Sequence, residues 1–143
     1  MKATRLQFKN DSKLEFLLRL HKVALFSCHR VDAEAAGVGS VCAFADTKNR
    51  AIFLIEEDCE HLSSESVRVM IYHELAHVID STLSESEADY FAECNTSREA
   101  LRRARLETEG VRLSIRAHRA GLHEMEQEFT NKLDRLHSLI GQI

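Results

Sequence analysis

Residues 64–80 contain two sets of side chains, one apolar and one able to bind cations, and an α-helix would place the two sets on separate faces. Apolar residues recur every three or four positions, and residues able to bind cations recur at a similar spacing. In a helix of about 3.6 residues per turn, the two sets fall on opposite sides. The apolar set is Val67, Ile71, Leu75 and Val78, and the second set is His73, His77 and Asp80. The sequence therefore predicts a helix, capped by Ser63 or Ser64, that buries one face and exposes the other.

The segment before this helix is expected to contain another helix and a β-hairpin. Ser12 and Glu15 have the spacing of a capping box, and the apolar residues after them predict a helix that runs to Cys28. Two short apolar stretches, residues 38–46 and 50–58, flank a turn-like Asp-Thr-Lys-Asn sequence and predict the hairpin. The second stretch contains Ile-Phe-Leu-Ile, which is apolar on both faces, so its strand is expected to be buried from two sides.

The chain contains no proline, and beyond residue 96 only Gly110 and Gly121 interrupt a helical pattern that reaches Ile140. Apolar or small residues recur there every three or four positions, which is typical of a nearly heptad seam. This seam comprises Ala104, Thr108, Val111, Ile115, His118, Leu122, Met125, Phe129, Leu133, Leu136 and Ile140. One continuous helix would measure on the order of 60 Å. We therefore expect it either to fold back near a glycine or to pair with a second chain.

His73, Glu74 and His77 form a His-Glu-x-x-His motif, whose spacing suits metal-assisted hydrolysis. Residues four apart stack on one helix face, so both imidazoles can reach one ion. Imidazole nitrogens suit Zn²⁺, which takes about four ligands in a tetrahedron. Glu74 is rotated by about a quarter turn from His73, so its carboxylate can reach a water on the ion and accept its proton. The motif therefore predicts two zinc ligands and a catalytic base.

A third ligand is expected from the acidic residues that follow the motif helix. Glu85, Glu87 and Asp89 lie within two helical turns of a bend near Thr82, and a second helix is expected to begin near Ser84. Two capping boxes compete, Ser84 with Glu87 and Thr82 with Glu85. The first would engage Glu87 and leave Glu85 for the metal, with Asp89 one turn further to accept the other ring N–H of a ligand histidine. We predict Glu85 as the ligand, with Glu87 and Asp89 as alternatives.

This region resembles the gluzincin metallopeptidases, and in particular the ImmA/IrrE family. In that family His-Glu-x-x-His is followed by Glu-x-x-Ala-Asn or Glu-x-x-Ala-Asp and then by Phe-Ala. The corresponding residues here are Glu85, Ala88, Asp89, Phe91 and Ala92. The resemblance covers about residues 12–95 and implies a small zincin-like fold of helix, hairpin, motif helix and ligand helix. It also implies a zinc-dependent peptidase with Glu74 as its base and a regulatory protein, such as a repressor, as its substrate.

Charge and hydropathy disfavour several classes of partner. Residues 46–97 carry 12 acidic against 3 basic side chains, which suits divalent cations or basic partners and argues against a nucleic-acid groove there. No run of about 18 apolar residues is present, so no membrane span is expected. The N-terminus lacks the pattern of a signal peptide, and the four cysteines are far apart. We therefore expect reduced thiols and a cytoplasmic location.

Two further features have competing interpretations. The segment from residue 98 to residue 119 contains seven arginines and three glutamates but no aromatic residue, so a solvated face or self-association with the acidic segment is favoured over nucleic-acid binding. Tyr72 precedes the motif, yet its helix position points it away from His73. Core packing is therefore expected for Tyr72 rather than a role as an oxyanion donor. The remaining histidines, His29 included, have no spacing that predicts a metal site.

Together these features predict an α+β zinc metallopeptidase with a domain over residues 1–96 and a long helical, coiled-coil-like extension over residues 97–143. The predicted metal ligands are His73, His77 and Glu85, with Glu74 as the base. The strand near residues 51–55 is expected to present its backbone to an extended protein or peptide substrate. The alternative is a catalytically weak zincin-like binding module that acts through its long C-terminal helix on a protein or a nucleic acid. Since a structural zinc site needs no base, Glu74 favours catalysis.

Overall fold

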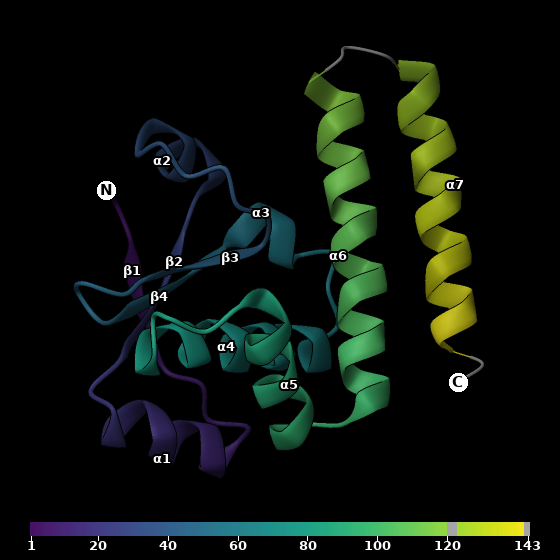
Figure 1. The fold of residues 1–143 in the computed structure, drawn as a ribbon. Helices are drawn as coiled ribbons and strands as arrows, with labels where there is room; N and C mark the ends of the chain where they lie inside the picture. Colours follow the sequence, from purple (N-terminus) through teal and green to yellow (C-terminus); the bar gives the residue numbers. More distant parts are fainter. Residues whose placement is uncertain (120–122, 142–143) are drawn as a thin grey trace.

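A four-stranded mixed β-sheet organises the first part of the chain (Figure 1). The computed structural model describes residues 1–119 and 123–141. The strands are β1 (Thr4–Leu6), β2 (Ala24–Cys28), β3 (Ala43–Asp46) and β4 (Ala51–Ile55). They lie in the order β1-β2-β4-β3, and only the pairing of β2 with β4 is parallel among these four. The expected α+β class is thus confirmed, with helices on both sides of the sheet.

The predicted helix from Ser12 to Cys28 is wrong in its second half. Helix α1 spans Ser12–Leu20 only, and the chain then turns at Lys22, whose φ of 54° lies in the left-handed region and cannot continue a right-handed helix. Residues 24–28 form β2 instead, which pairs with β4. The apolar spacing suits either element, and the long-range pairing with β4 decides between them.

The N-terminus of α1 also differs from the expected capping box. The Asp11 side chain, not that of Ser12, accepts a hydrogen bond of 3.0 Å from the backbone N–H of Leu14. Asp11 also accepts a hydrogen bond of 2.9 Å from the Tyr72 hydroxyl, which ties the start of α1 to the motif helix. Asp11 can cap α1 and bind Tyr72 at once because each of its two carboxylate oxygens accepts from a different donor, whereas the single hydroxyl oxygen of Ser12 offers no such pair.

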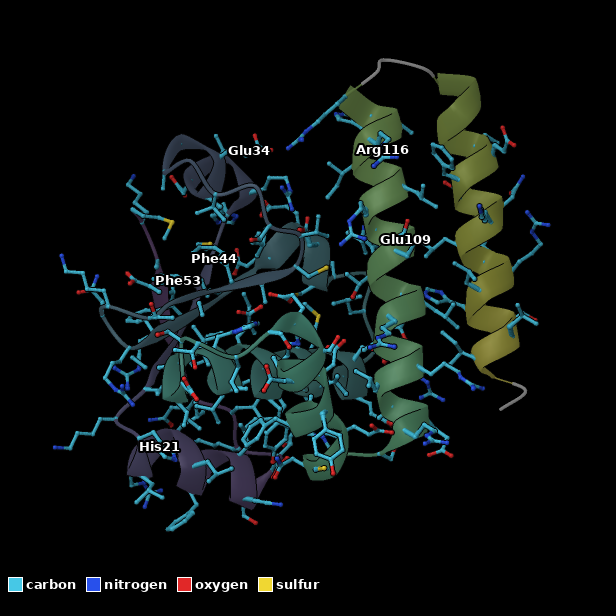
Figure 2. The ribbon with its side chains drawn as sticks, in the orientation of Figure 1. His21, Glu34, Phe44, Phe53, Glu109 and Arg116 are labelled. Atoms are coloured by element: carbon cyan, nitrogen blue, oxygen red, sulfur yellow. The ribbon has the colours of Figure 1, made fainter. Side chains whose placement is uncertain are left out.

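The predicted hairpin is confirmed, but its free edge is the other strand. β3 and β4 pair antiparallel, with Phe44 opposite Phe53 and their rings stacked at 4.9 Å (Figure 2). β4 is buried on both faces as expected, with Ile52 and Ile55 in clusters on opposite sides of the sheet. Because β2 pairs with the far edge of β4, the edge strand of the hairpin is β3 and not β4. The expectation that residues 51–55 offer a free edge is therefore wrong.

Two short helices, α2 (Arg30–Ala35) and α3 (Glu56–Cys59), are joined by an ion pair at one end of the sheet. The buried carboxylate of Asp58 accepts hydrogen bonds from the Arg30 guanidinium and, at 2.8 Å, from the backbone N–H of Cys42. Cys42 has a φ of 71°, a strained value for a residue with a side chain. Asp58 therefore fixes the start of β3, the strand that borders the candidate site described below.

The motif helix α4 (Ser64–Ile79) lies across one face of the sheet (Figure 1). Its predicted apolar face is confirmed, since Ile71 and Leu75 are fully buried in the main core. Ser63 caps its N-terminus by accepting a hydrogen bond from the N–H of Ser66, and Asp80 ends it. Burial of this face fixes the rotation of α4 about its axis and so decides where the histidines point.

The C-terminal segment is two helices, α6 (Arg98–Arg119) and α7 (His123–Ile140), that lie side by side (Figure 1). Of the two expected arrangements, the fold-back is confirmed, and pairing with a second chain stays a prediction. At Gly110 of α6 an added Cβ would overlap the Leu133 side chain of α7, so this glycine permits the close approach of the helices. The predicted break at Gly121 and the seam residue Leu122 lie outside the described residues, as does the side chain of Met125.

Helix α6 is joined to the core by apolar and polar contacts. Ala100, Leu101 and Ala104 belong to the main buried cluster. The carboxylate of Glu107, 2% exposed, accepts hydrogen bonds of 2.6 Å from the Ser63 N–H and 3.0 Å from the Ser66 hydroxyl. Glu107 thereby supplements the N-cap of α4 with a negative charge, where the helix dipole favours one. The division into domains at residue 96 stays a prediction, and the first half of α6 packs in the same core as α4.

Among the described helices, none combines the length and the apolar character needed to cross a bilayer.

The four cysteines are free thiols, with Cys28 and Cys42 buried and Cys94 exposed. Burial raises the pKa of the Cys59 thiol to about 12, which keeps it protonated at neutral pH.

We predict that Glu107→Ala lowers the free energy of unfolding by about 2 kcal/mol, because it leaves the Ser63 N–H and the Ser66 hydroxyl without their acceptor. Denaturant titration followed by circular dichroism measures the change. Glu109→Ala, which removes an exposed carboxylate from the same helix, is the control and should stay within about 0.5 kcal/mol of wild type. Equal stability of the two variants would contradict the capping role.

Candidate metal centre

The two motif histidines converge on one point beside α4. Because they are four residues apart, their rings lie on successive turns, and their Nε2 atoms are 3.2 Å apart. Each side chain is 16% exposed, so both imidazoles are held by their surroundings but remain open to the surface. The predicted pairing of His73 with His77 on one helix face is therefore what the structure shows.

The third side chain at this point is Glu85, the first residue of helix α5 (Glu85–Asn95). Its two carboxylate oxygens lie 2.9 Å from Nε2 of His73 and 3.2 Å from Nε2 of His77. The short turn after Asp80 reverses the chain, so the beginning of α5 returns to the last turn of α4. Glu85 is 82% exposed and reaches the histidines from the solvent side.

The spacing of these ligand atoms fits a tetrahedral cation. Zinc bonds of about 2.0–2.1 Å place the ligand atoms of a tetrahedron roughly 3.3 Å apart. The closest distances between the three residues run from 2.9 to 3.2 Å, and their candidate ligand atoms all lie within 4.8 Å of one another. The donor set of two nitrogens and a carboxylate thus fits Zn²⁺.

Asp89 orients one of the two rings. It lies one turn after Glu85 on α5, and its Oδ1 is 2.8 Å from Nδ1 of His73. A carboxylate accepts only, so Nδ1 carries the proton in this contact, and with a cation at the centre the lone pair of Nε2 would be free to face the ion. This is the arrangement predicted for Asp89 as the partner of a ligand histidine.

The two alternative acidic residues have other partners. Glu87 accepts a hydrogen bond of 3.0 Å from the backbone N–H of Ser84, which lowers the pKa of Glu87 and completes the predicted capping box. Thr82 does not cap Glu85, since its hydroxyl donates to Asp80 at 2.6 Å. Asp80 is thereby engaged as the C-cap of α4. The structure brings Glu85 rather than Glu87 to the histidines, and its ligand role stays a prediction.

Glu74 lies beside this cluster in a mostly buried position. Burial raises the pKa of its carboxyl group to about 7; His73 opposes the rise and the nearby Glu85 adds to it. A buried carboxylate at this pKa exchanges its proton near neutral pH, as a general base requires.

Two cavities meet at Glu74. One of about 490 Å³ is lined by Ala43, Phe44 and Ala45 of the edge strand β3, together with His77 and Glu85. The other, of about 330 Å³, lies between α4 and α6 and includes His73 and apolar side chains such as Met70. Arg112 of α6 lines both.

Tyr72 is fully buried and donates its hydroxyl hydrogen to Asp11, so the packing interpretation is confirmed.

A second acidic group surrounds His29, whose Nδ1 is 3.1 Å from Glu56 and 3.3 Å from Glu57. Glu57 already accepts from the backbone N–H of Arg30 with both oxygens. Sequence spacing does not reveal this group or the contributions of α6, because each joins residues far apart in the chain.

No family model, curated protein or solved structure matches this chain. The interpretation of the centre therefore depends on its own geometry and on the resemblance of its motif.

We predict that Glu74→Gln stabilises the metal-free protein at pH 8 by about 2 kcal/mol. Between pH 4.5 and about 7, Glu74 keeps its proton in the folded chain but loses it in the unfolded chain. The folded state therefore becomes progressively less stable as the pH rises through this range. At pH 5 the gain should shrink to less than about 1 kcal/mol. Denaturant unfolding in the presence of a chelator measures both values, with Glu109→Gln as the exposed control. The same gain at both pH values would contradict the assigned burial effect.

Proposed function

We propose that this chain is a zinc-dependent peptidase that hydrolyses a peptide bond in an extended segment of a protein. The observation that carries the proposal is the mostly buried carboxylate of Glu74, with a raised pKa, at the junction of two cavities beside a cluster of candidate ligands. The cluster is His73, His77 and Glu85. Base, ligands and open space are all required for hydrolysis at one point, and here they adjoin.

The ligand set leaves room for chemistry. Three side chains of this type suit catalytic zinc, which keeps its fourth position for water or substrate. When bound, zinc would act as a Lewis acid and lower the pKa of a coordinated water to roughly 7. Asp89 would hold the His73 ring in the tautomer that turns Nε2 toward the ion.

Glu74 would move the proton. Its side chain projects into the cavity next to the ligand cluster and can accept a proton from the attacking water. The same carboxyl group can then donate that proton to the leaving amine nitrogen, because its pKa near 7 permits both states. A cation at the centre would favour the charged, basic form.

The edge strand β3 supports a peptide as the substrate. It pairs with β4 on one side only, and its residues form one wall of the 490 Å³ cavity that contains Glu74. An extended peptide can add to such an edge through backbone hydrogen bonds and present its bonds to the centre. The resemblance to the ImmA/IrrE family favours a regulatory protein as the source of that peptide.

The alternative proposal is a zinc-containing binding module without catalysis. Its expected surface, the seam of the long helix, is used within the chain where α6 packs on α7, with Val111 and Ile140 buried. Self-association through residues 97–143 stays a prediction. A structural zinc site has no need of a mostly buried, destabilising carboxylate at position 74, and this favours the peptidase.

The ligand assignment predicts one Zn²⁺ per chain in the purified protein. His73→Ala, His77→Ala and Glu85→Ala should each lose most of the metal, since three protein ligands are the minimum for such a site. Glu87→Ala should keep it, because Glu87 caps α5. Elemental analysis after gel filtration measures the ratio. Full retention of zinc by Glu85→Ala would move the third ligand to another residue.

The base assignment predicts that Glu74→Gln keeps zinc but lowers kcat/KM by about 10²- to 10⁴-fold. Digestion of a protein-derived peptide library by the zinc-loaded enzyme, read by mass spectrometry, measures the effect. Glu128→Gln, at an exposed carboxylate of α7 that is absent from the lining of both cavities, is the control and should cut like wild type. A wild-type protein that binds zinc but cuts no more than Glu74→Gln would support the binding module.

A further inference from the structure

Helix α6 reaches the candidate metal centre through Arg105. The guanidinium of Arg105 donates to Oδ2 of Asp89 at 2.5 Å. The other oxygen of the same carboxylate, Oδ1, lies 2.8 Å from Nδ1 of His73. One carboxylate on α5 thus connects an arginine of α6 to a histidine of α4.

The two contacts of Asp89 fix different degrees of freedom. A carboxylate with one partner can rotate about its terminal bond and exchange its oxygens. A guanidinium on Oδ2 opposes that rotation and keeps Oδ1 aimed at the His73 ring. The ring orientation in turn decides whether Nε2 faces His77 and Glu85.

We infer that Arg105 is a positioning residue of the metal centre, acting through Asp89 on His73. The inference rests on the ligand set proposed above. Among the residues that the structure describes, Arg105 is the only arginine within hydrogen-bond distance of Asp89. Other arginines of α6 have different acidic partners, Glu93 for Arg98 and Glu109 for Arg112.

The role of Arg105 is geometric rather than stabilising. Its side chain is 63% exposed, and exposed ion pairs contribute little to the free energy of folding. Asp89 is only 23% exposed, so the orientation of its carboxylate is the property that the arginine changes. The consequence is that metal affinity depends on α6, the helix that sequence analysis places outside the metallopeptidase domain.

The test measures the zinc dissociation constant by competition with a chromophoric chelator. Asp89→Ala should weaken zinc binding by about 10- to 100-fold, as is typical for partners of metal ligands. Arg105→Gln should weaken it by about 3- to 10-fold, and Arg105→Lys should recover part of the loss. The double variant Arg105→Gln, Asp89→Ala should bind as weakly as Asp89→Ala alone, because the arginine acts only through that carboxylate.

Arg102→Gln is the matched control, since Arg102 is an exposed arginine on the same helix. It should bind zinc like wild type, and thermal unfolding should show that all the variants fold. Wild-type affinity in Arg105→Gln would overturn the inference, as would a loss in the double variant that equals the sum of both single losses.

A second readout needs no metal. Ring ¹⁵N chemical shifts in the metal-free protein report which nitrogen of His73 carries the proton. Arg105→Gln should change the shifts of His73, whereas Arg105→Lys and Arg102→Gln should leave them close to wild type. If wild type binds no zinc, the proposed function fails, and unchanged His73 shifts in Arg105→Gln would separately overturn the role of Arg105.

Discussion

The burial of one face of α4 is the constraint from which the candidate centre follows. Ile71, Tyr72 and Leu75 are fully buried against the sheet and α1, so the helix cannot rotate about its axis. With that face fixed, His73 and His77 must point toward the opposite side, where α5 returns. The hydrophobic effect therefore positions polar side chains that it does not itself contact.

The other elements then complete a centre that α4 cannot form alone. α5 brings Glu85 and Asp89 to the histidines. α6 contacts both the start of α4 and the Asp89 carboxylate on α5. Glu107 of α6 accepts a hydrogen bond from the first turn of α4. Arg105, two residues before Glu107 on the same helix, donates to Asp89. The first half of α6 therefore packs in the same hydrophobic core as α4 and contacts the residues around the candidate centre.

The predictable parts of the fold are those with local causes. The apolar stripe of α4, the capping box of Ser84 and Glu87, and the turn between β3 and β4 each depend on residues within a few positions of one another. The predictions that were wrong concern features that depend on pairing between strands far apart in the sequence. Residues 24–28 form a strand because β4 offers them a partner, and β3 becomes the edge because β2 occupies the other side of β4. Neither pairing leaves a signal in the segment itself.

The sequence by itself determined the motif helix, the shared face of His73 and His77, and the nomination of Glu85 and Asp89, because helical spacing converts sequence separation directly into direction. Only the tertiary structure decided that Glu74 is mostly buried, that β3 borders the cavity, and that Arg105 reaches Asp89. These properties depend on which elements meet across the core. Burial and contact between distant segments are set by the packing of the whole chain, and no local spacing encodes them.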